Sequence, residues 1–79
     1  MTLAEAKLLY DSGAISDPII YKPRGKNGWC LQFSSNQPVK FKLKIETERG
    51  SLRIFKNINA AIGIAEKIGV SEVKLILKN

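Results

Sequence analysis

Residues 39–45 read VKFKLKI, a strict alternation of apolar side chains with lysines. Because successive side chains of a β-strand point to opposite faces of the sheet, this stretch predicts a strand with one apolar and one cationic face. Phe41 and Leu43 are expected in the core. Lys40, Lys42 and Lys44 are expected in a row on the outer face.

The segments on either side of this strand alternate in the same way. Residues 29–33 and 52–54 each place apolar side chains at every second position, and turn residues separate them from residues 39–45. Antiparallel hairpins are therefore expected, with Gln32, Ser34 and Arg53 on the outer face beside the lysines. The residues expected in the core are Trp29, Leu31, Phe33, Phe41, Leu43, Leu52 and Ile54.

Phe55 has two possible positions. It shares its phase with Arg53, which predicts exposure on the outer face, but it also precedes a predicted helix and can pack beneath the start of that helix. Two further strands are expected, one over residues 19–22 after a turn at Asp17-Pro18 and one over residues 73–77.

Two helices are expected from their capping signals. Thr2 and Glu5 have the spacing of a capping box, and Asn57 can cap a second helix that ends at Gly69. Gly63 falls inside the second helix, where glycine is unfavourable relative to alanine by up to about 1 kcal/mol. Close packing of another element against Gly63 would explain it.

Together these segments predict an α+β fold in a single domain of residues 1–79. An antiparallel sheet of three to five strands is backed by one helix, with an additional helix at the N-terminus. One sheet face then has no helix over it, a common arrangement for antiparallel sheets.

Size and composition limit the class of protein. A chain of 79 residues builds a thin core, and no apolar run approaches the roughly 20 residues that cross a bilayer. The start of the chain lacks the pattern of a secretory signal, and a single cysteine, Cys30, excludes an internal disulfide. These features predict a cytoplasmic protein with no membrane partner.

The charge is distributed unevenly. The chain carries 13 Lys and Arg against 7 Asp and Glu, a net charge of +6. Residues 20–56 contain nine of the cations and two of the carboxylates, so the whole excess falls in this middle segment. Such asymmetry indicates a surface that meets phosphates or an acidic protein.

Catalytic and metal-binding chemistry is poorly represented. The chain contains no histidine, which is the commonest general base and zinc ligand, and one cysteine cannot form a structural zinc site. The glycines do not follow the spacing of a phosphate-binding loop. We therefore expect neither an enzyme nor a protein that binds a cofactor or a metal.

Two groups of residues are candidates for binding. The first is the basic sheet face, where lysines can hold phosphates, an arginine can clamp a phosphate or read guanine, and a glutamine can touch base edges; its members are Lys40, Lys42, Lys44, Arg53 and Gln32. The second is the loop of residues 22–28, with Lys22, Arg24 and Lys26. Each group is also compatible with an ordinary solvated surface.

The stretch from Trp29 through residues 53–56 into Ala60-Ala61 resembles the arm-site DNA-binding domains of tyrosine integrases. That resemblance implies a three-stranded sheet, backed by a helix, that enters the major groove. Residues 2–7, 13–15, 49–56, 60–61 and 68–69 resemble small partition-associated accessory proteins of bacterial plasmids, which implies a mobile-element protein working with DNA or a partition partner.

Three hypotheses follow. The chain binds the backbone of DNA or RNA as an accessory protein of a plasmid or phage. Alternatively, it is a mobile-element inhibitor, of anti-CRISPR or anti-restriction type, whose basic face occupies an acidic patch on a host defence protein. A third hypothesis is a homodimer in which the strand of residues 73–77 pairs with that of a second copy.

Overall fold

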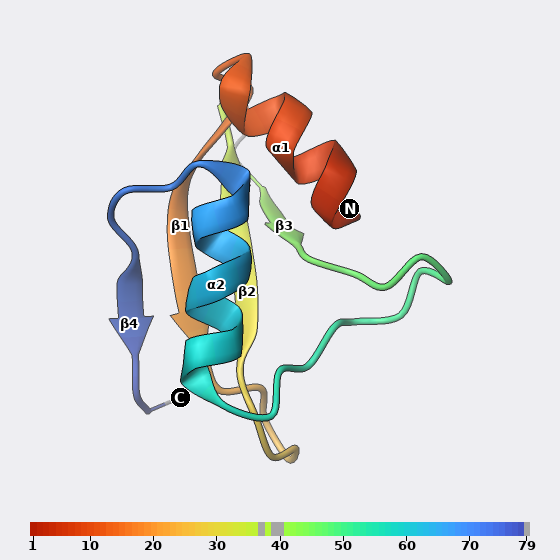
Figure 1. Cartoon of the computed structure of the whole chain (residues 1–79), viewed down its shortest axis with the longest axis vertical. Coiled ribbons are helices and arrows are strands. Elements are labelled where there is room, and N and C mark those ends of the chain that lie inside the picture. Colours follow the sequence, from red (N-terminus) through yellow and green to blue (C-terminus); the bar gives the residue numbers. More distant parts are fainter. Residues whose placement is uncertain (37, 39–40, 79) are drawn as a thin grey trace.

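The computed structural model describes residues 1–36, 38 and 41–78. Its elements, in chain order, are α1 (Leu3–Asp11), β1 (Ile15–Tyr21), β2 (Cys30–Ser35), β3 (Lys42–Lys44), α2 (Ile58–Ile68) and β4 (Lys74–Ile76) (Figure 1). The four strands form one sheet in the order β3-β2-β1-β4. β2 is antiparallel to both β1 and β3, whereas β4 is parallel to β1. The predicted α+β fold with a mostly antiparallel sheet is confirmed.

Both helices lie on the same face of the sheet. α2 crosses in front of β1 and β2, and α1 lies over the upper end of the sheet (Figure 1). The ring of Tyr10 in α1 contacts that of Phe33 in β2, with 5.8 Å between the ring centroids. In the described part of the chain, no helix covers the opposite sheet face.

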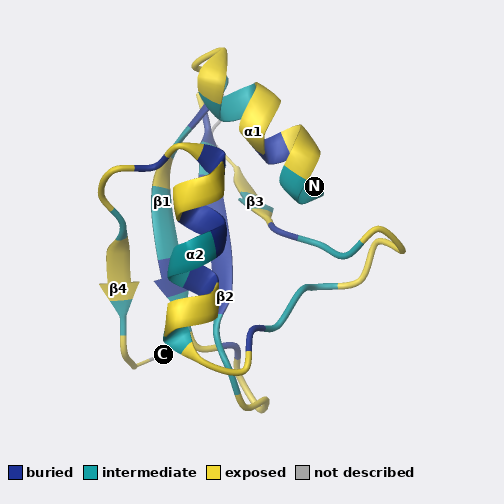
Figure 2. Cartoon of the chain, in the orientation of Figure 1, coloured by how far each residue is buried: buried dark blue, intermediate teal, exposed yellow. Residues whose placement is uncertain are grey.

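The core lies between the helices and the inner sheet face. Figure 2 shows β2 buried along most of its length and α2 with a buried stripe toward the sheet. Burial of this apolar surface is the main stabilising contribution to such a fold. The largest fully buried side chains are Phe33, Ile20, Leu31, Ile45, Ile68 and Cys30.

The capping signals form as the sequence predicts. The Thr2 hydroxyl accepts from the Glu5 amide, and the Glu5 carboxylate accepts from the Thr2 amide. The Asn57 side chain accepts from the Ala60 amide at 2.9 Å, and Gly69 ends α2 in the left-handed conformation. These local hydrogen bonds satisfy backbone groups that a helix end leaves unpaired.

β1 begins earlier than the sequence predicts. Asp17 and Pro18 lie inside the strand, where the register against β2 shifts between Ser16 and Ile19, and Asp17 has a positive φ of 54°. The expected turn at this position is therefore wrong, because a β-bulge accommodates the proline that cannot donate to the ladder.

Phe41 was expected in the core and is exposed, whereas Phe55, for which two positions were possible, is buried. Phe41 lies beside the last residue of β2, with its carbonyl 2.9 Å from the Ser35 amide, and is 51% exposed. Phe55 exchanges two backbone hydrogen bonds of 2.8 Å with Trp29, and its ring is buried. The bridge to Trp29 fixes the phase of this segment, so Phe55 joins the core while Leu52 and Ile54 are half-buried.

Ile54 and Phe55 pack closely against Gly28. A Cβ atom added there would lie 2.6 Å from the Ile54 Cγ2 and from the Phe55 carbonyl oxygen, and φ is +112°. At Gly63, by contrast, no other element among the described residues comes within 4 Å of such a Cβ, so the expected close packing against it is wrong. In the described part of the chain, neither helix is long and apolar enough to cross a membrane.

We expect Gly28→Ala to lower the unfolding free energy by at least about 2 kcal/mol, because the backbone conformation and the contact with Phe55 both oppose a side chain. Gly25→Ala is the matched control: its φ is also positive, but a Cβ there meets open space, so only the cost of about 1 kcal/mol for the backbone applies. Urea denaturation measures both. Equal losses would contradict the packing at Gly28.

Gly63→Ala should raise the unfolding free energy by about 0.5–1 kcal/mol, since alanine has the higher helix propensity and nothing obstructs its methyl group. Thermal and urea unfolding of the variant provide the measurement. A loss of stability would show that another group packs at this position.

Candidate functional site

Lysines from both edge strands share the helix-free face of the sheet. In β3, Lys42 lies opposite Ser34 and Lys44 opposite Gln32. Across the sheet, Gln32 lies opposite Ile19, which in turn lies beside Lys74 of β4. Because laterally paired residues point to the same face, these lysines all project away from the helices.

Lys78 joins the same surface just after β4. It lines a shallow hollow of about 330 Å³ whose other lining residues are Tyr21, Gln32, Lys42, Lys44 and Ile76. We call the surface formed by Lys42, Lys44, Lys74 and Lys78 the lysine face. None of the described residues that line this hollow is acidic.

The floor of the hollow is formed by the middle strands. Gln32 is only 7% exposed, and Cys30 is fully buried beside Tyr21. Burial raises the pKa of Tyr21 to about 12, and the neighbouring Cys30 thiol adds to this effect. Tyr21 is therefore neutral at physiological pH and brings no negative charge to the lysine face.

The positive charge of Lys44, at the rim of the hollow, acts on Tyr21 and Cys30 in its floor. The Lys44 ammonium lies 5.6 Å from the centroid of the Tyr21 ring, within the range of a cation–π contact. Burial raises the pKa of the Cys30 thiol, while the neighbouring Tyr21 hydroxyl and the positive charges of Lys44 and Lys26 act in the opposite direction. A buried thiol with a raised pKa is a poor nucleophile.

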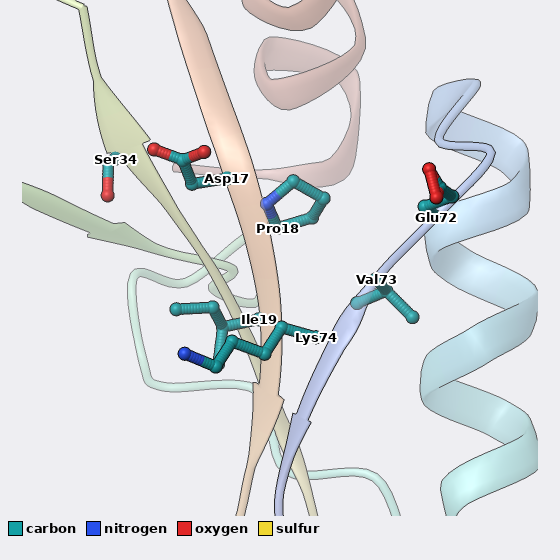
Figure 3. Close-up of a pocket in the computed structure, with 7 residues that line it drawn as sticks. All are labelled: Asp17, Pro18, Ile19, Ser34, Glu72, Val73 and Lys74. Atoms are coloured by element: carbon teal, nitrogen blue, oxygen red, sulfur yellow. The ribbon is translucent and has the colours of Figure 1, made fainter.

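The lysine face ends at a mixed surface near the start of β1 and β4. A second hollow there is lined by Asp17, Pro18, Ile19, Ser34, Glu72, Val73 and Lys74. Figure 3 shows Asp17 and Ser34 on one side of β1, Glu72 and Val73 on the other, and the Lys74 side chain lying across Ile19. The carboxylates therefore mark one border of the cationic surface.

The basic residues predicted from the sequence do not all lie together. The Arg53 guanidinium lies 5.0 Å from the centroid of the buried Phe55 ring, and the Lys22 ammonium lies 5.0 Å from the Trp29 ring. Both rings belong to the helix side of the sheet, so the expected place of Arg53 on the outer face is wrong. Arg24 is exposed on the loop, and Lys40 lies outside the described residues.

The sequence-based site lacked Lys74, Lys78 and Tyr21. For the two lysines the sequence contained a usable pattern. Lys74 and Lys78 are both an odd number of positions from Leu75 and Leu77, so in a strand they point to the face opposite the leucines. The excess of positive charge in residues 20–56 indicated a cationic surface in that segment alone, which excludes Lys74 and Lys78. Only the neighbourhood of β4 and β1 brings the distant lysines to the same face.

Among the described residues, no group of three or more Cys, Asp or Glu side chains is arranged to hold a metal ion. Comparison with protein-family models, with curated proteins and with solved structures found no match for this chain.

The tyrosinate titration of the folded chain should contain a step near pH 12 that disappears in Tyr21→Phe. Because the pKa of Tyr21 is raised on folding, stability is fully present below about pH 10, the unfolded pKa, and is lost as pH rises through the folded value. Near-UV absorbance follows the titration. Tyr10→Phe is the control, and a late step that survives in Tyr21→Phe would contradict the assignment.

Proposed function

We propose that this chain is a non-enzymatic nucleic-acid-binding accessory protein, of the kind that plasmids and phages carry, and that it contacts phosphates through the lysine face. The observation that carries the proposal is the convergence of lysines from both edge strands on one helix-free face, around a hollow with no acidic lining residue among those described. An extended cationic surface of this kind attracts a polyanion.

The spacing of the lysines suits a phosphate backbone. Lys42 and Lys44 are two residues apart in one strand, about 6.8 Å, which is close to the separation of successive phosphates along one nucleic-acid strand. The β3 and β4 lysines are separated by three strand spacings, about 14 Å in all. Two rows at this separation can hold backbone segments on either side of the central hollow.

The chemistry of the contacts predicts binding with little sequence preference. Lysine is a mobile, strongly hydrated point charge that neutralises phosphates without reading bases. Gln32 lies in the floor beneath the lysines and is nearly buried, so its amide is poorly placed to reach a base edge. Arg53 is directed toward Phe55 and contributes nothing to the lysine face.

One observation supports the alternative of an inhibitor that binds an acidic patch on a host defence protein. The hollow also contains Ile76 and the Tyr21 ring, and an apolar centre inside a charged rim is typical of protein–protein interfaces. A pull-down from host lysate, with and without nuclease, separates the two. Nucleic-acid binding predicts that co-purifying material is lost after nuclease, whereas a stoichiometric protein that survives nuclease would favour the inhibitor.

The double variant Lys42→Gln/Lys44→Gln should weaken DNA binding and reduce the slope of log K against log salt by about 2, because each lost phosphate contact removes about one released counterion. Fluorescence anisotropy with a labelled duplex across a salt series measures the slope.

The matched control is Lys7→Gln/Lys67→Gln, which removes the same charge from exposed positions on the helices. We expect a much smaller change in slope for this variant. Equal slopes in the two double variants would contradict a localised phosphate site, and no binding by the unmodified chain at low salt would contradict the proposed function.

A further inference from the structure

The outer edge of β4 pairs with no other strand in the described part of the chain. The sheet order leaves β3 and β4 at the two edges, and among the described residues β4 pairs only with β1. Leu75 and Leu77, on the helix side of this edge, are 42% and 60% exposed. An edge strand with unpaired backbone groups and exposed apolar side chains is a template for pairing with another strand.

The C-terminal end of the β3 edge, and the residues that follow it, are covered by the chain itself. The Met1 ammonium donates to the Lys44 carbonyl at 3.0 Å, and the Glu46 amide donates to the Met1 carbonyl at 2.7 Å. The Arg53 amide donates to the Ile45 carbonyl at 3.1 Å. Self-pairing about the middle of β3 would also place Lys42 opposite Lys44 of a second copy, and like charges in opposite positions are destabilising.

We propose that two copies of this chain join at β4, edge to edge and antiparallel, about a two-fold axis at Leu75. Two-fold antiparallel pairing makes each contact twice, because a residue and its counterpart exchange places. With the axis at Leu75, Glu72 lies opposite Lys78 of the second copy, and Val73 lies opposite Leu77. Leu75 then lies opposite itself and Lys74 lies opposite Ile76, so no lysine faces another lysine across the axis.

Neighbouring registers lack this complementarity. An axis at Lys74 places Lys74 opposite itself, and an axis at Ile76 places Lys74 opposite Lys78. A shift of one position places leucines beside lysines, because the side-chain period of a strand is two. Of the registers about Lys74, Leu75 and Ile76, only the one about Leu75 pairs Glu72 with a lysine and sets no lysine opposite another, and the occupant that satisfies it is a second copy of this chain.

The joined sheet would have a defined shape. Residues opposite each other share a face, so the helices of both copies lie on one side and an eight-stranded sheet presents the lysine faces on the other. That the joined lysine faces bind one nucleic acid rests on the proposed function, but the pairing of the two β4 strands does not.

The test is the oligomeric state without nucleic acid. Sedimentation velocity of the full chain, from low micromolar to millimolar concentration, should show a reversible dimer. Glu72→Lys or Lys78→Glu alone places like charges opposite each other twice and should weaken dimerisation at least about tenfold, while the double variant Glu72→Lys/Lys78→Glu restores the pairing in reverse and should bring the dissociation constant back to within about threefold of the unmodified chain.

Two controls keep the charge changes interpretable. Glu48→Lys and Lys67→Glu alter exposed residues of the hairpin tip and of α2 by the same amounts, and should leave the dissociation constant unchanged. A monomer at every concentration would overturn the proposal, as would single charge reversals without effect or a double reversal that fails to restore the dimer.

Cysteine cross-linking checks the register independently. Leu75→Cys places two thiols opposite each other, within the Cα separation of about 4.5–5.5 Å that a disulfide spans. Leu77→Cys places its thiol opposite Val73 of the second copy, and Cys30 is fully buried. We expect mild oxidation to link the Leu75→Cys variant alone, and preferential linking of Leu77→Cys would overturn the register. Duplex-binding anisotropy on the same variants scores the proposed function separately.

Discussion

The burial of β2 on both of its faces is the constraint on which the rest of the structure depends. Leu31 and Phe33 face the helices, while Cys30 and Gln32 face the opposite side, and all four are nearly inaccessible to solvent. A strand can be covered on a helix-free face only if its neighbours supply long side chains that lean over it. Tyr21 and Lys44 do so here, since both line the hollow above Gln32. The covering of β2 therefore also builds the floor and rim of the candidate site.

This arrangement links stability to charge. The lysine stems cover apolar and polar groups of the middle strands while their ammonium groups remain in water, as long basic side chains commonly do. Lys44 illustrates this, because its ammonium lies over the Tyr21 ring and its charge acts on the Cys30 thiol. The two edges also differ as a result. The N-terminal residue and the Arg53 segment cover the C-terminal end of β3, whereas β4 carries exposed leucines between lysines and, among the described residues, pairs with no strand at its outer edge.

Local patterns predicted the elements better than the positions of individual side chains. The caps at Thr2, Asn57 and Gly69 were correctly predicted, because they depend on hydrogen bonds within one helical turn. The outer face of β2 and β3 was also correct for Gln32, Lys42 and Lys44. The phase of residues 52–55 was wrong, because the bridge between Trp29 and Phe55, and not the alternation within the segment, sets which side chain enters the core. Nothing in the sequence near Gly28 shows that it lies against this bridge.

The sequence by itself determined the α+β class, the helix ends and the alternation that separates lysines from core residues, since these depend on the geometry of neighbouring residues in one segment. Only the tertiary structure decided which segments lie side by side. It placed β4 parallel to β1, more than fifty residues away in the chain, and so brought Lys74 and Lys78 to the face that holds Lys42 and Lys44. It also turned Arg53 toward the Phe55 ring, away from that face. Pairing between distant strands depends on the core as a whole, and no local pattern of residues records it.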